Sequence, residues 1–289
     1  MTDASAAQTH PVCYRHPERE SYIRCQRCAR FICPDCQRQA AVGFQCVECV
    51  REGSRSARPA RTRFGGVVRG EGAPVTKVLI GINAAIFVLV LIFGRSLAEW
   101  LALVGADMFV DSTGGEMAGV SGGAYWRLVS AAFVHTEIWH LAVNMLSLWI
   151  LGPMLEHLLG REWFLGLYLI AGVAGSAVAY AFTSPFVPVV GASGAIFGLF
   201  GAMVVFARRM RADMSWFVGV LLINLVLNVL FQRFLSWQAH LGGFVAGLAV
   251  GVILAYAPRK PAVRGIGVAI LLAAMIALVV WRTGQLTGL

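Results

Sequence analysis

Charged residues are scarce in this chain. Asp, Glu, Lys and Arg make up 13% of its 289 residues, and 58% are hydrophobic. A soluble globular domain carries about a quarter charged residues. A soluble fold is therefore excluded, and the sequence predicts a polytopic membrane protein.

Cysteine is absent from most of the chain, because all seven cysteines lie between Cys13 and Cys49. A thiol nucleophile in the apolar part is thus excluded. The first ten residues, Met1 to His10, lack an apolar core. We therefore expect no cleaved signal peptide, and expect the first membrane helix to direct insertion.

Acidic residues are outnumbered, 15 to 24, which gives a net charge of +9. The basic residues gather between apolar segments, at 51–69, 208–211 and 259–264. This pattern is typical of topology signals and not of one nucleic-acid-binding face. We expect a lipid bilayer as the partner of this chain and no nucleic acid.

The apolar segments predict an all-α polytopic membrane protein with six core helices and a seventh at the C-terminal end. Seven segments suit a hydrocarbon core of ~30 Å. They are residues 78–94, 138–155, 163–182, 193–207, 215–232, 238–257 and 265–282. The connection between the first two segments, from Arg95 to Glu137, is long and mixes polar with apolar residues, so we predict a structured loop there.

Composition divides the chain into four predicted parts. They are a cysteine-rich module at 11–50, a flexible basic linker at 51–76, a membrane core at 77–257 and an extra C-terminal helix at 258–289.

The arginines predict the orientation. With a cytoplasmic N-terminus, most loop positive charge falls inside, as the positive-inside rule requires. Ser193 and His240 then both begin helices that enter from the outside, so both lie near the external face. Only 15 residues separate Ser193 from Arg208, about 22 Å of helix. Ser193 is therefore expected below the membrane surface.

Ser193 and His240 are the strongest functional candidates. Ionisable groups at membrane depth are costly and tend to be functional, and Ser and His are the nucleophile and base of acyl transfer. Ser193 alone fits a helix-packing face, and His240 alone fits a buried core histidine. Small residues recur every four positions after each of them: Gly194, Gly198 and Ala202, then Gly243, Gly247 and Gly251. Such faces let helices approach closely, so we predict a Ser–His dyad without a third carboxylate.

His140 and Asn144 lie four residues apart and share one helix face. Beside a serine nucleophile they suit an oxyanion hole, completed by the Ser193 backbone N–H. The alternative is an interhelical hydrogen bond. His135 and His157 read as structural or interfacial, and Glu156 as a partner of nearby loop backbone groups.

Several motifs together resemble rhomboid intramembrane serine proteases. They are Trp126-Arg127, the His140 and Asn144 pair, Gly191-Ala192-Ser193-Gly194, and Ala239-His240 followed by Gly243, in that order. The similarity covers about residues 76–257, with a seventh span as in the "six plus one" members.

The resemblance implies that Ser193 is the nucleophile, that His240 is the general base, and that His140 and Asn144 bind the oxyanion. Phe197 occupies a position where the family often has Tyr near the base, and Trp126-Arg127 would be structural. The implied activity is cofactor-free cleavage of transmembrane segments of other proteins, with a small residue before the cut. Substrates would enter past the fifth span, with its following loop as a lid.

The N-terminal module carries four metal-ligand pairs. They are Cys13 with His16, Cys25 with Cys28, Cys33 with Cys36, and Cys46 with Cys49. Each pair suits half of a tetrahedral zinc site, so eight ligands predict two structural zinc ions. Disulfides are excluded by the odd cysteine count and the reducing compartment expected.

The spacing resembles a B-box-type zinc finger. That likeness implies that the first and third pairs share one zinc, and the second and fourth the other. Sequential pairing is the alternative. The module is expected to bind a cytoplasmic protein or to regulate the core.

The sequence thus predicts an intramembrane serine endopeptidase of a bacterial plasma membrane. The alternative is a non-proteolytic membrane-protein binding or quality-control factor on the same scaffold.

Overall fold

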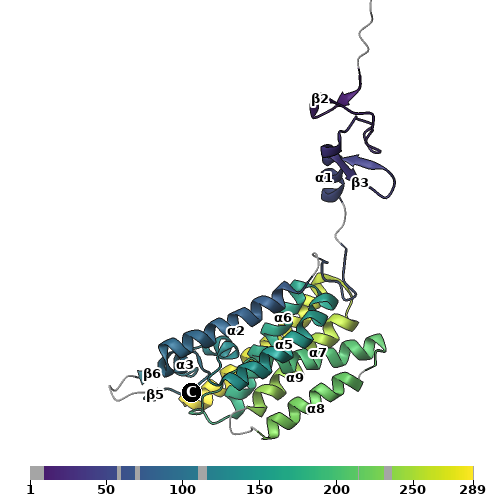
Figure 1. Ribbon diagram of the computed structural model, residues 1–289. Coiled ribbons are helices and arrows are strands. Elements are labelled where there is room, and N and C mark those ends of the chain that lie inside the picture. The colour runs from purple at the N-terminus through teal and green to yellow at the C-terminus, as the bar shows by residue number, and fades with distance from the viewer. Residues whose placement is uncertain are drawn as a thin grey trace, which may run out of the picture. The chain divides into compact units, whose positions relative to one another are not determined.

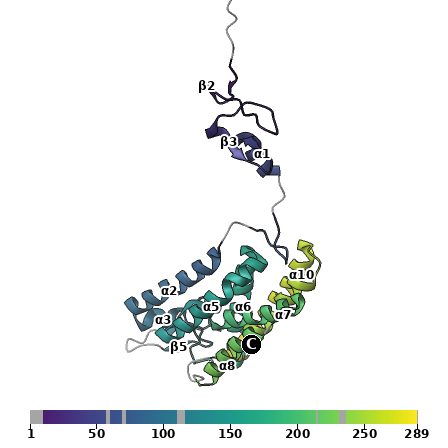
Figure 2. The same ribbon diagram turned by 45° about the vertical axis from the view of Figure 1, so that its right-hand side comes forward.

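The computed structural model describes residues 10–56, 60–68, 72–109, 116–213, 215–230 and 236–288. The chain forms two compact units, Met1–Pro59 and Ala60–Leu289 (Figures 1 and 2). Each unit has its own core and is described by itself.

The first unit is small and is built around its cysteines. Its elements are β1 (Val12–Cys13), β2 (His16–Glu20), η1 (Pro34–Cys36), β3 (Gln37–Gln39), β4 (Phe44–Cys46) and α1 (Val47–Ser56). β1 pairs antiparallel with β2, and β3 with β4. The core consists of the cysteines and Ile32, with Tyr14 and Val47 packed against them. So few apolar side chains favour a metal as the source of stability.

The second unit is helical. Its elements are α2 (Pro74–Phe93), α3 (Arg95–Leu101), β5 (Met108–Phe109), β6 (Glu116–Met117), α4 (Arg127–Ser130), η2 (Ala131–Phe133), α5 (Ile138–Leu159), α6 (Arg161–Phe182), α7 (Ser193–Met210), α8 (Ser215–Leu230), α9 (Trp237–Tyr256) and α10 (Pro261–Thr287). β5 and β6 form a short hairpin in the first loop. The predicted all-α polytopic fold is confirmed.

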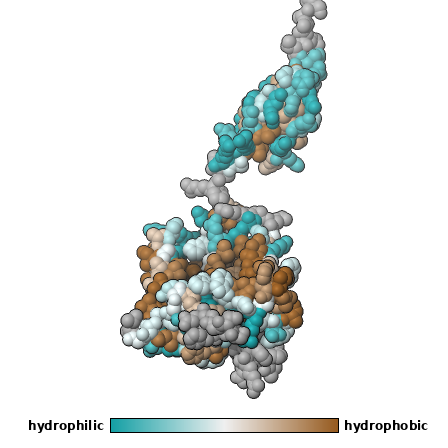
Figure 3. Space-filling view, turned by 90° about the vertical axis from the view of Figure 1, so that its left-hand side faces the viewer, coloured by the Kyte–Doolittle hydropathy of each residue, from teal (hydrophilic) through white to brown (hydrophobic). Residues whose placement is uncertain are grey.

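Six described helices, namely α2, α5, α6, α7, α9 and α10, are long and apolar enough to cross a membrane. Apolar side chains cover much of the face of this bundle in Figure 3. The fifth predicted span corresponds to α8, which has 16 residues. Of the loop predicted as a lid, residues 233–237, residues 233–235 lie outside the described residues, whereas Ser236 and Trp237 form the N-cap and first residue of α9.

α7 and α9 pack with almost no space between their backbones. A methyl group on Gly243 would overlap the carbonyl oxygen of Gly194, and one on Gly247 would overlap that of Gly198. Among the described elements, the most extensive contacts are those of α7 with α9 and of α6 with both. The small-residue faces therefore determine which helices are neighbours.

The first loop is held by one arginine. Arg127 has an exposed fraction of 0% and donates to the backbone carbonyls of Glu99 and Ala102 at 2.6 Å and of Ala118 at 2.9 Å. Burial lowers the pKa of its guanidinium. This agrees with a structural role for the Trp126-Arg127 motif.

The structure differs from the flexible linker predicted over residues 51–76. Residues 51–56 continue helix α1. Residues 60–68 form a tight hairpin, closed by hydrogen bonds from Thr62 N–H to Gly66 O and from Val68 N–H to Ala60 O, both at 2.8 Å. We call this segment the N-terminal hairpin. It belongs to the second unit.

The hairpin is ordered because its tip is buried. The Phe64 ring packs against Phe206 of α7 with centroids 4.5 Å apart, and its carbonyl accepts a hydrogen bond from Arg264 at 2.7 Å. Arg264 also donates to Leu254 O at 2.9 Å. One aromatic residue among arginine and glycine residues resembles a linker by composition, and the structure differs from that prediction over residues 60–68.

Glu156 caps the first membrane helix. Its carboxylate accepts hydrogen bonds from the backbone N–H groups of Val75 and Thr76, at 3.1 and 2.9 Å, and from the Thr76 hydroxyl at 2.9 Å. These N–H groups belong to the first turn of α2, so they have no hydrogen-bond acceptors within the helix, and a carboxylate there is favoured by the helix dipole.

Candidate active site

Ser193 and His240 meet at the ends of two adjacent helices. Ser193 is the first residue of α7, and His240 lies in the first turn of α9. The distance from His240 Nε2 to Ser193 Oγ is 2.7 Å. The His240 side chain is buried, with an exposed fraction of 5%. The close packing of α7 on α9 produces this short distance.

The orientation of the His240 ring is set by an aromatic neighbour. Phe197, one turn after Ser193, stacks on His240 with centroids 4.3 Å apart and an interplanar angle of 7°. The first turn of α9 is fixed by Ser236, whose hydroxyl accepts from the Ala239 N–H at 3.3 Å. An apolar ring and a helix cap thus hold the imidazole beside the hydroxyl.

His140 lies beside the backbone that precedes Ser193. Gly191 has φ +119°, and a methyl group there would lie 2.5 Å from His140 Cε1 and 2.8 Å from His140 Nε2. Only glycine tolerates this conformation and approach. His140 Nε2 is buried and has no hydrogen-bond partner in the described structure. A donor so placed suits a negative charge that forms only during a reaction.

Asn144 lies one turn further along α5 and is also buried. Its side-chain nitrogen donates to His140 O at 2.9 Å. The pair therefore shares a face, as the spacing predicts, and its role in binding an oxyanion stays a prediction.

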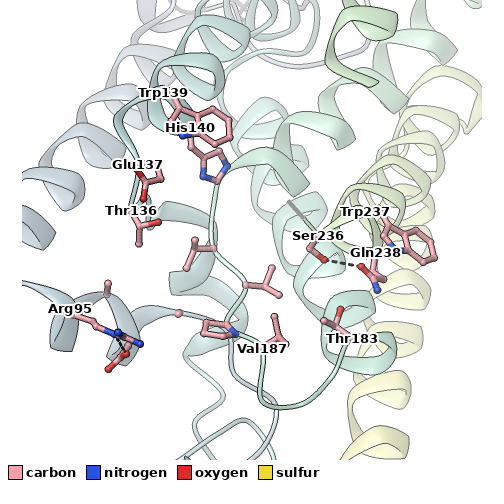
Figure 4. A pocket seen from close by; sticks show the side chains of 16 residues that line it. Arg95, Thr136, Glu137, Trp139, His140, Thr183, Val187, Ser236, Trp237 and Gln238 are labelled. Carbon is pink, nitrogen blue, oxygen red and sulfur yellow. Dashed lines mark hydrogen bonds and ion pairs between the residues drawn. The ribbon is translucent and has the colours of Figure 1, made fainter. Parts of the chain in front are cut away.

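A cleft of about 520 Å³ reaches His140 and the N-terminal end of α9 (Figure 4). Thr136, Glu137, Trp139 and His140 line one side, and Ser236, Trp237 and Gln238 the other. The segment 187–190 passes between them. A narrow second cavity of about 20 Å³ adjoins Ser193 and is lined in part by Ala131, Gly172 and Ser176. That volume holds about one water molecule.

Two further histidines considered in the sequence analysis, His157 and His135, differ in their distance from Ser193 and His240. His157 is exposed on the last turn of α5. His135 is fully buried next to His140, with ring centroids 4.9 Å apart. The sequence pattern gave no reason to connect His135 with Ser193, because His135 lies outside the predicted membrane spans. Its contact with the Ala192 N–H is visible only in the folded structure.

The eight metal-ligand candidates of the first unit form two clusters. One contains Cys13, His16, Cys33 and Cys36, the other Cys25, Cys28, Cys46 and Cys49, each with ligand atoms within 4.8 Å of one another. This is the interleaved grouping, and the sequential pairing does not form.

The spacing of the ligand atoms fits a tetrahedral ion. His16 Nδ1 lies 3.8, 3.3 and 3.5 Å from the Sγ atoms of Cys13, Cys33 and Cys36. Cys28 and Cys46 Sγ are 3.8 Å apart. Zinc bonds of about 2.0 Å to nitrogen and 2.3 Å to sulfur give tetrahedral edges of about 3.5–3.8 Å.

The thiols of the two clusters differ in pKa, and burial raises that of Cys36 to about 11 and that of Cys49 to about 12. Burial raises the pKa of Cys13, but hydrogen bonds from the backbone of Cys33, Arg15 and His16 outweigh it and bring the pKa to about 6. The pKa of Cys25 is about 6 for the same kind of reason, since burial is outweighed by backbone hydrogen bonds. Thiolates are the metal-binding form.

Fold and site together define a polytopic helical membrane protein with a buried Ser–His pair. A family profile described as "Rhomboid domain" matches residues 122–257. The putative rhomboid protease YdcA of Bacillus subtilis is 31% identical over 185 residues, which cover 62% of this chain and 88% of YdcA. The chain belongs to the rhomboid family.

Two further relatives are covered only in part. The rhomboid protease GluP of Bacillus subtilis is 33% identical over 184 residues, 62% of this chain and 34% of GluP. RHOMBOID-like protein 5 of Arabidopsis thaliana is 38% identical over 149 residues, 48% of this chain and 47% of that protein. The chain thus spans about a third of one relative and half of the other.

Proposed function

We propose that this protein is an intramembrane serine endopeptidase that cleaves transmembrane segments of other membrane proteins. The observation that carries the proposal is the 2.7 Å distance between Ser193 Oγ and His240 Nε2 at a buried site. Family membership supports it, since relatives named as rhomboid proteases are 31% and 33% identical.

In this proposal Ser193 Oγ attacks the scissile carbonyl carbon and transfers its proton to His240 Nε2. The tetrahedral intermediate then collapses, and His240 donates that proton to the leaving amine nitrogen. A water molecule attacks the acyl-enzyme by the same route and regenerates Ser193. No cofactor takes part in these steps.

The negative charge of the intermediate is stabilised at the start of α7. The Ser193 N–H belongs to the first turn of a helix, where the dipole favours an anion. His140 Nε2, buried beside Gly191, donates a second hydrogen bond, and Asn144 assists. We propose these three groups as the oxyanion hole.

The substrate is proposed to lie in the cleft of Figure 4, with a small side chain before the cut. The narrow cavity beside Ser193, about 20 Å³ with Ala131 and Gly172 in its lining, supports a small residue there. The arginine-rich loops at the opposite helix ends support a cytoplasmic N-terminus and cleavage near the external face.

Active-site labelling tests the activity. We expect a fluorophosphonate to label the wild type and not Ser193→Ala, and to label His240→Ala at least ~100-fold more slowly. Turnover of a model transmembrane substrate in proteoliposomes should be lost in both variants.

The competing function is a non-proteolytic membrane-protein binding or quality-control factor. It requires no Ser–His contact. Substrate capture that persists in the wild type without any cleavage product, or turnover retained by Ser193→Ala, would support it against the protease.

We also propose that the first unit holds two structural zinc ions and binds a cytoplasmic protein. The ligand clusters and their tetrahedral spacing support the metal. Zinc supplies folding free energy to the unit and no catalytic step.

Metal analysis tests the two clusters. The wild type should contain two zinc ions for each chain. Cys36→Ser and Cys49→Ser should each lose one, because they interrupt different clusters, and the double variant should lose both. If Cys13→Ser and Cys36→Ser together removed two ions instead of one, the interleaved grouping would be wrong.

A further inference from the structure

His135 is a buried polar side chain to which the proposed mechanism gives no role. It follows η2 and precedes His140 by five residues, and its exposed fraction is 0%. A buried histidine whose contacts are unrelated to the site would simply fill space. The contacts of His135 are instead directed at the two parts of the oxyanion hole.

The first contact is with the backbone in front of the nucleophile. The Ala192 N–H donates to His135 Nε2 at 3.4 Å, a long hydrogen bond in a buried environment. Ala192 is fully buried and is the N-cap residue of α7. Without the histidine this N–H would have no acceptor, which buried backbone groups rarely tolerate. His135 therefore fixes the residue directly before Ser193.

The second contact is with the proposed oxyanion donor. The rings of His135 and His140 meet edge to face, with an interplanar angle of 63°. Trp139 packs near the His140 ring as well, at 5.6 Å between centroids. His135 thus supports the ring that would donate from Nε2.

A third contact strengthens the same connection. The Gly191 N–H donates to Ala131 O at 2.9 Å. The segment 131–135 therefore holds two consecutive backbone N–H groups, those of Gly191 and Ala192. The next N–H in the chain is that of Ser193, the proposed backbone donor of the oxyanion hole.

We propose that His135 is a positioning residue for the oxyanion hole: it holds the Ser193 N–H and the His140 ring in place without touching the substrate. The inference rests on the proposed peptidase function. It requires a neutral ring with its proton on Nδ1, because Nε2 must accept from Ala192.

The inference predicts a specific kinetic effect. Oxyanion contacts exist only in the transition state, so their loss lowers kcat and leaves KM almost unchanged. A purely structural histidine would instead lower the unfolding midpoint and the active fraction, without regard to whether its replacement can accept a hydrogen bond.

The test compares His135→Gln with His135→Met in proteoliposomes. The two replacements have similar length, but only glutamine offers an amide oxygen to the Ala192 N–H. We expect kcat to fall at least ~10-fold in the methionine variant, less than the ~100-fold or more for a direct oxyanion donor. The glutamine variant should have a kcat at least ~5-fold higher than that of the methionine variant, and KM should stay within ~2-fold of wild type in both.

Titration with a fluorophosphonate gives the active fraction, so that kcat refers to folded enzyme, and His157→Met serves as the exposed control. Equal kcat in the two variants, or a loss confined to the unfolding midpoint, would overturn the inference. If the methionine variant does not fold, a folded glutamine variant with kcat below ~1% of wild type overturns it, and one within ~5-fold supports it. Turnover retained by Ser193→Ala would refute the peptidase itself, which is a separate result.

Discussion

Phe197 shows how one side chain controls the proposed base. Its ring lies parallel to His240 at 4.3 Å, so it restricts the imidazole to orientations that face Ser193. The neighbouring Phe200 contacts Phe197 edge to face, at 5.9 Å, and offers a comparison with a second buried aromatic ring on the same helix.

We predict that Phe197→Leu lowers kcat about 10-fold, because the ring of His240 loses its flat support. Phe197→Tyr should retain most activity, since it keeps the ring. The matched control is Phe200→Leu, which is expected to affect stability more than kcat. Peptidase assays with active-site titration distinguish these effects. A Phe197→Leu enzyme with unchanged kcat would show that the helix cap alone orients His240.

Residue type and rarity made Ser193 and His240 predictable from the sequence. A serine and a histidine inside apolar segments stand out, because polar groups at that depth need a reason. His135 could not be predicted in the same way. It lies in a turn outside any periodic pattern, and its partner is Ala192, 57 residues away.

Helix packing is where the sequence was most informative. The four-residue spacing of small residues predicted a close approach of α7 and α9, and the backbones meet at Gly194 with Gly243 and at Gly198 with Gly247. The chemistry of the site therefore depends on residues that take no part in it.

We predict that Gly247→Ala destabilises the bundle by roughly 1–3 kcal/mol through overpacking and reduces turnover by moving α9 away from α7. Gly166→Ala on α6 is the control, because a methyl group there meets open space and alanine favours a helix. Unfolding in mixed micelles measures the first effect and substrate cleavage the second. Equal stability of the two variants would mean that the helices can separate without cost.

The two ligand clusters of the first unit were predictable for a different reason. Pairs of ligand residues separated by two positions are a direct signal of metal binding in the sequence. The division of the pairs into two clusters depends instead on how β1, η1 and β4 bring distant pairs together. Spacing alone left the interleaved and sequential groupings open.

At the scale of the whole molecule, the second unit begins earlier than composition indicates. The boundary falls between Pro59 and Ala60, not at Lys77, because Phe64 is buried against Phe206 and Glu156 requires the N–H groups of Val75 and Thr76. Composition did not indicate this boundary, because the segment is rich in arginine and glycine. The burial of Phe64 nevertheless makes the segment part of the second unit.

We therefore predict that a chain of residues 60–289 folds and cleaves substrate, whereas one of residues 77–289 is less stable by at least about 2 kcal/mol. Burial of one phenylalanine contributes about that much, and the helix cap is lost in addition. Unfolding in micelles compares the two chains. Phe64→Ala in the full chain is the point-variant control and should show part of the loss. Equal stability of both truncations would place the boundary at Lys77 after all.

The hairpin also sets an order for biosynthesis. Its tip is secured by the guanidinium of Arg264, which lies 200 residues further along the chain. During translation the ribosome has made helices α2 to α9 before Arg264, at the start of α10, is added. The Phe64 ring can pack on Phe206 once α7 has been made, but the hydrogen bond that closes the hairpin tip forms only after the start of α10 is added.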